Sequence, residues 1–352
     1  MPPNAYPQSQ ITEMITPMVT ANSGRQAVMR RMHASSRVDT RYLVQELSGY
    51  RVSQTFTETN GIFIDVATNL AEEALGKALA ASGVTAAEID FIVFTSVTGI
   101  SAPSIDALLV PRLGLRTDVK RVPMFGLGCV AGAAGLARVN DYLLGHPNEV
   151  AVLISVELCS LTVQKDDDSM ANIVASGLFG DGAAAVVVLG DERARSTPGL
   201  GLDILDTRSR LYADTNDVLG FNPGETGFKI ILTAGVADVI EQNFGADMAG
   251  FLGDNGLVTA DIGAWVAHPG GPRVLEAFSE SLDLPEGSLS LSWESLARVG
   301  NLSSASVLHI LADTIAEGRA LPGQYGMLFA LGPGVCAELV LLQWAQNEEV
   351  AA

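Results

Sequence analysis

Cys129 combines a reactive side chain with a position at the start of a predicted helix. It lies in Gly126-Leu-Gly-Cys129, where a short extended run gives way to a predicted helix over residues 130–145. Unpaired N–H groups and the dipole at a helix N-terminus stabilise a thiolate, which attacks carbonyl carbon readily. A small cysteine buried under a helix explains the same pattern, so the stretch alone leaves both interpretations open.

His268 and Asn301 lie at comparable positions later in the chain. His268 ends a predicted strand over 264–267 and precedes a glycine-rich turn, where open α/β sheets place their sites. Asn301 precedes a predicted helix over 307–317, and its alternative role is an N-cap. A cysteine can carry an acyl group as a thioester, while an imidazole and an amide can donate hydrogen bonds to an oxygen that gains negative charge.

Alternating apolar runs and helical spacing predict an α/β fold around these residues. Buried strands are predicted over 89–96, 149–156 and 182–189, helices over 65–81 and 172–178, and a hairpin over 327–342. The segment 84–94 is echoed by 258–268, with matching elements in matching order around it. We therefore expect two duplicated halves: a lead-in over 1–24, a half with the cysteine over 25–200, and a half with the histidine and asparagine over 201–352.

Composition excludes several classes of protein. The 352 residues are 48% hydrophobic and 17% charged, which is typical of a compact globular chain. A net charge of −19 argues against a nucleic-acid partner and an anionic membrane surface. Three scattered cysteines do not form a disulfide framework or a zinc site, and neither a signal peptide nor a membrane span is evident. We expect a cytoplasmic protein without a metal and without stable membrane association.

Five of the 21 basic residues fall between positions 25 and 41. In so acidic a chain this arginine cluster could receive the phosphates of a nucleotide-bearing thioester. A solvated helix face paired with nearby acids explains it equally well.

The order cysteine, histidine, asparagine occurs in two classes of enzyme. A papain-like protease is excluded, because its Cys-Gly-Ser-Cys-Trp signature is absent and 128 residues precede Cys129. The other class comprises enzymes that form carbon–carbon bonds by condensation. Five motifs in order support it: Gly126-Leu-Gly-Cys-Val-Ala-Gly, Leu178-Phe-Gly-Asp-Gly-Ala-Ala, His268-Pro-Gly-Gly-Pro, Gly300-Asn-Leu-Ser-Ser-Ala-Ser and Leu331-Gly-Pro-Gly. Together they resemble the type III polyketide synthases, the chalcone-synthase-like branch of the thiolase superfamily, over residues 25 to 345.

The resemblance implies a thiolase fold, layered αβαβα, and a role for each candidate residue. Cys129 would be the nucleophile, loaded with a starter acyl group from its coenzyme A thioester, and ionised by an ion pair with His268. His268 and Asn301 would bind the malonyl thioester carbonyl and stabilise the enolate left by loss of carbon dioxide. That enolate would then attack the Cys129 thioester in a Claisen condensation.

The resemblance also implies a substrate cavity and a coenzyme A site. Phe179 and Phe228 match two gatekeepers at the mouth of the cavity, although a single phenylalanine is by itself more typical of a hydrophobic core. Further cavity positions are Thr162, Ser303 and the loop Gly332, Pro333 and Gly334, where Leu331 and Ala330 replace the usual aromatic residue and glycine. The candidate contacts to coenzyme A phosphates are Arg25, Arg30, Arg31 and Arg273.

The expected protein is a homodimeric acyltransferase with acyl-coenzyme A and malonyl-coenzyme A as substrates and no cofactor. Ala102, Leu127 and Val130 resemble bacterial members, some of which accept medium- or long-chain fatty acyl starters and release α-pyrones or alkylresorcinols. The alternatives are a β-ketoacyl-acyl carrier protein synthase of the III type, which performs one condensation, and a non-catalytic partner subunit of thiolase fold.

Overall fold

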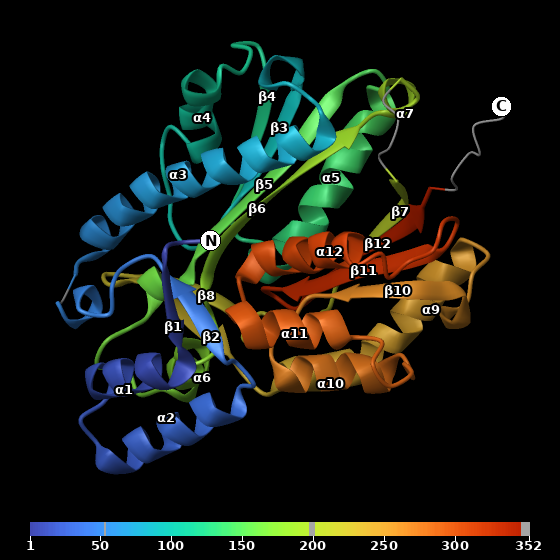
Figure 1. Ribbon diagram of the computed structural model, residues 1–352. Helices are drawn as coiled ribbons and strands as arrows, with labels where there is room; N and C mark the ends of the chain where they lie inside the picture. Colours follow the sequence, from blue (N-terminus) through green and yellow to red (C-terminus); the bar gives the residue numbers. More distant parts are fainter. Residues whose placement is uncertain (53, 197–200, 346–352) are drawn as a thin grey trace.

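Two four-stranded sheets form the framework of the protein, with helices between them and on both outer faces (Figure 1). The computed structural model describes residues 1–52, 54–196 and 201–345. The element order is α/β throughout, which confirms the predicted fold class.

The first sheet has the order β4-β3-β5-β6. The strand β3 (Phe91–Thr95) runs parallel to β4 (Lys120–Met124) and to β5 (Val150–Leu158), and β5 pairs antiparallel with β6 (Asp181–Leu189). Every residue of β5 is buried, as expected for an apolar strand covered by helices on both faces.

The second sheet has the order β10-β11-β12-β7. The strand β10 (Ile262–Ala267) runs parallel to β11 (Tyr325–Gly332), and β12 (Cys336–Trp344) pairs antiparallel with both β11 and β7 (Leu202–Leu211). Thus β10, β11 and β12 repeat the arrangement of β3, β5 and β6. The duplication predicted from the sequence echo is present in the topology of the sheets.

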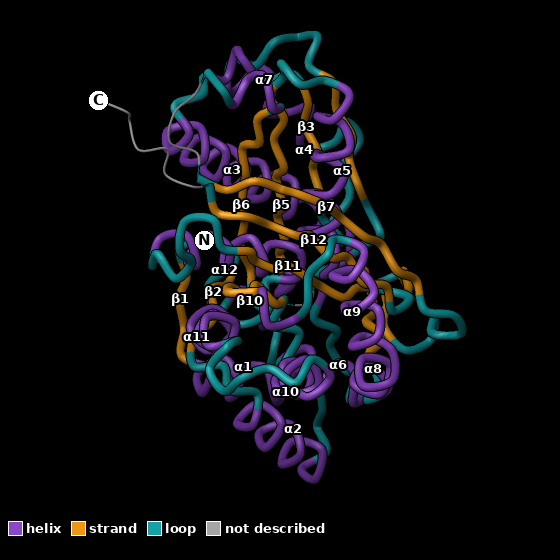
Figure 2. Tube along the Cα trace, turned by 90° about the vertical axis from the view of Figure 1, so that its right-hand side faces the viewer, coloured by secondary structure: helices purple, strands orange, loops and turns teal. Residues whose placement is uncertain are grey.

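Two helices fill the space between the sheets. Apolar residues of α5 (Ala131–Gly145) and α12 (Ser306–Ala316) share one core cluster with β3 and β5 of the first sheet and with β10, β11 and β12 of the second. The helices α3 (Phe56–Ser82) and α4 (Ile105–Leu113) cover the outer face of the first sheet. The helices α8 (Gly235–Val239), α9 (Gly245–Asp254) and α10 (Pro272–Ser281) cover the outer face of the second, so the chain has five layers (Figure 2).

The remaining elements surround these layers. They are β1 (Asn4–Pro7), α1 (Gln8–Val19), α2 (Ser23–Ser35), β2 (Thr40–Leu43), α6 (Met170–Ser176), α7 (Asp191–Ala194), β8 (Leu219–Gly224), β9 (Gly227–Leu232) and α11 (Ser290–Val299). The segment predicted as a polar lead-in contains β1, all of α1 and the first two residues of α2, and Ile11 and Ile15 of α1 are buried against Met29 of α2.

The start of α3 differs from the sequence prediction by nine residues. The helix begins at Phe56 and not at Asp65, because Thr55 and Glu58 form a capping box that satisfies the first free N–H groups. Its end at Gly83 is as predicted, with Gly83 in the left-handed conformation at φ 70°.

Candidate active site

The turn that carries Cys129 is pressed against the second half of the chain. Cys129 lies in a single 3-10 turn, Gly128–Val130, directly before α5. Gly128 has a φ of 54°, and a Cβ there would approach the ring of Pro333 to 2.8 Å. A Cβ on Gly132 would lie 2.2 Å from the carbonyl oxygen of Ser304. Glycine at both positions therefore allows the nucleophile to reach the residues of the second half.

Asn301 is fixed by its backbone and by its side chain. Its N–H donates to the Leu178 carbonyl at 2.9 Å, and its own carbonyl accepts from the N–H of Gly180 at 2.9 Å. Its side-chain Oδ1 accepts from the N–H of Ser303 at 2.8 Å, while Nδ2 lies 3.5 Å from the Gly270 carbonyl. Asn301 is not the N-cap of α12, which is Ala305, so the capping interpretation is wrong.

His268 presents an imidazole without a partner. It directly follows β10, and its N–H donates to the Phe329 carbonyl at 2.9 Å. The side chain is 2% exposed, and neither ring nitrogen has a hydrogen-bond partner among the described residues. Because an unpaired buried polar group is costly, this ring is suited to receive a polar group of a bound substrate.

Burial keeps both Cys129 and His268 in their neutral forms. It raises the pKa of the Cys129 thiol to about 12; hydrogen bonds from Ser303 and Asn301 act to lower it, and the charge of Glu157 acts to raise it further. Burial lowers the pKa of His268 to about 3. Neither shift favours the resting ion pair that the resemblance implied. Neutral partners are favoured in the free protein, because desolvation penalises the charged form of each.

Glu157 is a site residue that the sequence analysis missed. It is fully buried on β5 and accepts hydrogen bonds from the hydroxyls of Ser304 at 2.5 Å and Ser303 at 3.2 Å. The N–H of Val97 and the hydroxyl of Thr98 each donate to it at 3.1 Å. Burial raises its pKa to about 7. The available signal was a single carboxylate inside the otherwise apolar run 150–158, since an isolated acid rarely sits in a buried strand.

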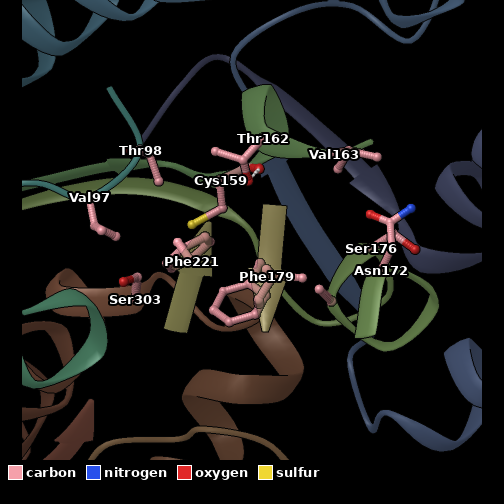
Figure 3. Close-up of a pocket in the computed structure, with 12 residues that line it drawn as sticks. Val97, Thr98, Cys159, Thr162, Val163, Asn172, Ser176, Phe179, Phe221 and Ser303 are labelled. Atoms are coloured by element: carbon pink, nitrogen blue, oxygen red, sulfur yellow. Dashed lines mark hydrogen bonds between the residues drawn. The ribbon is translucent and has the colours of Figure 1, made fainter. Parts of the chain in front are cut away.

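A small cavity lies beside Ser303 and Thr98, two of the partners of Glu157, and Cys129, His268 and Asn301 are not among the residues that line it. Thr162, Phe179 and Ser303 are among its lining residues (Figure 3). Cys159 and Phe221 also line it, and neither was predicted. The free space inside it is enough for about one water molecule, so the cavity is closely packed in the free protein.

The other predicted cavity residues lie around the nucleophile. Phe228 of β9 is 6% exposed and packs its ring against Phe125 and Phe56, with centroid distances of 5.8 and 5.4 Å. A Cβ on Gly332 would meet the Leu127 carbonyl at 2.5 Å, and Pro333 touches Gly128 as described above. The Gly332-Pro333-Gly334 loop thus supports the Cys129 turn from the second half, and its part in shaping the cavity stays a prediction.

The candidate phosphate contacts all lie on the surface. Arg25 pairs with Asp168 at 3.5 Å, Arg30 with Glu13 at 2.9 Å, Arg273 with Glu276 at 3.3 Å, and Arg31 is exposed. Exposed pairs of this kind are individually weak, so a phosphate can compete for them, and binding of coenzyme A by these arginines stays a prediction. Arg41 of the same cluster is 2% exposed and cannot reach an external phosphate.

The part of the chain that the structure describes has neither a cluster of metal ligands nor a helix that could span a membrane. No group of three or more His, Cys, Asp or Glu side chains there is placed to hold a metal ion. No described helix is both long and apolar enough to cross a membrane.

Comparisons with known proteins agree with this geometry. Residues 1–192 match the family "Chalcone and stilbene synthases, N-terminal domain", and residues 204–345 match the corresponding C-terminal domain. A 1,3,6,8-tetrahydroxynaphthalene synthase of Streptomyces peucetius subsp. caesius is 52% identical, over 98% of this chain and 91% of that protein. An "alpha-pyrone synthesis polyketide synthase-like" protein of Mycobacterium tuberculosis is 31% identical, over 90% of this chain and 82% of that protein.

Solved structures extend the agreement to the fold. The crystal structure of 1,3,6,8-tetrahydroxynaphthalene synthase from Streptomyces coelicolor, described as a bacterial type III polyketide synthase, has a TM-score of 0.92 and 28% identity. The match covers 98% of this chain and 97% of that one. With both family domains matched and the nucleophile turn, His268 and Asn301 in place, the chain belongs to the chalcone and stilbene synthase family, as a type III polyketide synthase of thiolase-like fold.

Proposed function

We propose that this enzyme builds a tetrahydroxynaphthalene-type product from malonyl-coenzyme A alone, using a malonyl group as the starter as well as the extender. The relative of that name shares 52% of residues over almost the whole chain, which is the observation that carries the proposal. A naphthalene ring has ten carbons, and oxygens at positions 1, 3, 6 and 8 alternate along its two rings. Five two-carbon units therefore suffice, with no alkyl starter.

The cavity supports a short starter. Phe179 and Phe221 leave little free space beside Ser303 and Cys159 (Figure 3). A chain that grows by two-carbon ketide units must fold back within this volume, and folding back brings its ends close enough to cyclise. The same walls carry the hydroxyl groups of Thr98, Thr162 and Ser303, and a long alkyl tail gains nothing from packing against them.

Loading begins with a neutral thiol. The Cys129 sulfur attacks the thioester carbonyl, its proton passes to a ring nitrogen of His268, and the C–S bond to coenzyme A breaks. Neither nitrogen of His268 has a partner among the described residues and the ring is neutral, so it can accept this proton. The proton then leaves with the coenzyme A thiolate, and the imidazole is neutral again for the next substrate.

Extension follows at the same place. The malonyl thioester oxygen accepts hydrogen bonds from His268 and the Asn301 amide, the bond to the carboxylate breaks, and carbon dioxide leaves. The electron pair stays on the α-carbon as an enolate, whose oxygen these two donors stabilise. The α-carbon attacks the Cys129 thioester carbonyl, and the sulfur leaves as a thiolate, which takes a proton from solvent to become the neutral thiol for the next loading. The steps use coenzyme A thioesters as substrates and need no separate cofactor.

A fatty acyl starter with an α-pyrone or resorcinol product is the second candidate. It is favoured by the 31% identical relative whose name refers to α-pyrone synthesis. It requires a path for the alkyl chain past Phe221, which the free protein does not leave open in the described cavity.

One incubation separates the two candidates. Labelled malonyl-coenzyme A is supplied alone, and then with acyl-coenzyme A starters of increasing chain length, and products are identified by mass. We expect the label in a ten-carbon aromatic product when malonyl-coenzyme A is alone, with little change on adding starters. Products formed only with an acyl starter would replace this proposal with the second one, and no labelled polyketide from any mixture would contradict both.

We also propose that the enzyme is a cytoplasmic homodimer joined along β4. This strand is the edge of its sheet and pairs only with β3 in the described chain, and its outer residues are exposed. Val122 is 41% exposed, Phe125 54% and Ile100 48%, an apolar set that a second copy would cover. Sedimentation should give a dimer for the natural chain and a monomer for Val122→Lys. An unchanged dimer in the variant would show that the subunits do not associate along β4.

A further inference from the structure

Arg41 is an arginine enclosed in the protein directly behind the catalytic asparagine. Its side chain is 2% exposed, although arginine is almost never buried unless it is paired. Its Nε donates to Gln8 at 2.9 Å and one terminal nitrogen donates to the Phe179 carbonyl at 2.8 Å. The second terminal nitrogen has no partner among the described residues.

The carbonyl that Arg41 holds belongs to the segment that fixes Asn301. Phe179 and Asn301 form a parallel bridge, in which Leu178 accepts from the Asn301 N–H and Gly180 donates to the Asn301 carbonyl. The aliphatic part of the Arg41 side chain packs against Gly300, the residue before Asn301. A Cβ on Gly300 would lie 3.1 Å from the Arg41 Cγ. Arg41 therefore touches both segments of this bridge, and it is not among the residues that line the cavity.

Charge adds to the constraint. Asp181 is fully buried nearby, where its carboxylate accepts from the N–H of Ser160 at 2.7 Å and from the N–H of Val44 at 2.7 Å. Its charge acts to keep Arg41 protonated against burial, and Arg41 in turn acts to keep Asp181 ionised. The carboxylate makes no direct contact with the guanidinium in the described structure, so the two hydrogen bonds to Gln8 and Phe179 fix its position, and the charge of Asp181 favours its protonated form.

We propose that Arg41 is a positioning residue for decarboxylation: its guanidinium fixes the Phe179–Gly180 backbone and thereby aims the Asn301 amide at the malonyl oxygen. This rests on the role proposed above for Asn301. A planar fork that serves two acceptors at once is a property of arginine, and lysine cannot reproduce it. Small displacements of a positioned donor have large effects on rate, since the transition state depends on its geometry.

The test uses decarboxylation of malonyl-coenzyme A by the full-length enzyme, because this step does not depend on which starter or product is correct. For Arg41→Lys we expect kcat to fall by about tenfold to a hundredfold. We expect KM to stay within about twofold, since Arg41 does not face the substrate. Gln8→Met removes one partner of Arg41 while keeping Arg41 itself, and should lower kcat less. It serves as the second variant if Arg41→Lys does not fold.

His33→Gln is the matched control. His33 is also 2% exposed in the N-terminal segment, but it ties α2 to α1 through Thr12 and to α6 through Ile173 and Ser176, and it has no hydrogen bond to Phe179 or Gly300. It should lower the melting temperature without a selective loss of kcat. Equal losses of kcat in His33→Gln and Arg41→Lys at equal melting temperature would overturn the proposal, as would full kcat in Arg41→Lys. A natural enzyme that decarboxylates yet makes no naphthalene product would contradict only the proposed function.

Discussion

The two halves of the chain act on the Cys129 thiol in opposite directions. Burial between the two halves raises the pKa of the thiol, and the charge of Glu157, on β5 of the first half, raises it further. The second half supplies hydrogen bonds from Ser303 and Asn301, which lower the same pKa. The duplicated fold brings these contributions together because both sheets flank the central helices α5 and α12.

The difference separates two tasks. The first half favours the neutral thiol through the charge of Glu157. A neutral thiol is protected between turnovers, since the thiolate is the reactive form. The second half carries every donor proposed to stabilise negative charge on the malonyl oxygen. Substitutions of Glu157 and of Asn301 should therefore shift the pKa of the Cys129 thiol in opposite directions.

The largest effect should come from removing the sulfur. Cys129→Ala is expected to abolish condensation, because no acyl group can be held as a thioester. Cys159→Ala is the matched control, since Cys159 is a second thiol, is 6% exposed and lines the cavity. It should change packing alone and leave turnover within about twofold. Equal loss in both variants, measured as labelled product per enzyme, would remove Cys129 from its assigned role.

Removing the amide should come next. Asn301→Ala is expected to lower kcat for malonyl-coenzyme A decarboxylation by about a hundredfold to a thousandfold, the usual cost of losing one donor to a developing oxyanion. The same change removes a hydrogen bond that lowers the thiol pKa, so alkylation of Cys129 by iodoacetamide should shift to higher pH. A lower kcat with an unshifted alkylation profile would mean that Asn301 serves the malonyl group alone.

Sequence reasoning predicted the fold correctly and proposed three reacting residues, because each has a strong local pattern. Buried strands are apolar runs, and Cys129 and His268 stand at the ends of such runs beside glycines. The ordered motifs then distinguished this chain from a protease. The start of α3 was missed because a capping box outside the apolar periodicity sets it, and Thr55 and Glu58 carry no hydrophobic signal.

Glu157, Phe221 and Arg41 escaped prediction for a different reason. Each matters through what faces it across the fold, and the facing residues are distant in the sequence. Glu157 meets Ser304 of the other half, and Arg41 meets the carbonyl of Phe179. Sequence also placed Arg41 in an exposed cluster, since a run of arginines usually indicates a solvated face. Whether such a side chain turns inward depends on a buried partner, here Asp181.

Phe221 should decide which starters fit. Phe221→Ala removes a ring from the cavity wall, so longer acyl starters gain room, and each buried methylene contributes about 0.8 kcal/mol. We expect the ratio of kcat/KM for an octanoyl starter to that for malonyl-coenzyme A to rise by about tenfold. Ile230→Ala, at another cavity wall, is the comparison for a smaller gain. An unchanged ratio in both variants would mean that the chain length is limited outside this cavity.

Glu157→Gln tests the first half of the comparison with the smallest change in shape. The carboxyl has a pKa of about 7 in the folded protein against 4.5 as the ordinary value, because burial penalises its charge. Its contribution to stability is therefore present below about pH 4.5 and is lost as the pH rises through about 7, a difference of about 3 kcal/mol. Glutamine has no such titration, so the difference in free energy of unfolding between the variant and the natural chain should move in favour of the variant between pH 5 and pH 8.

Removing the charge of Glu157 should also lower the pKa of the Cys129 thiol, so alkylation should shift to lower pH, opposite to Asn301→Ala. Shifts in the same direction for both variants would mean that the halves do not oppose each other at the sulfur.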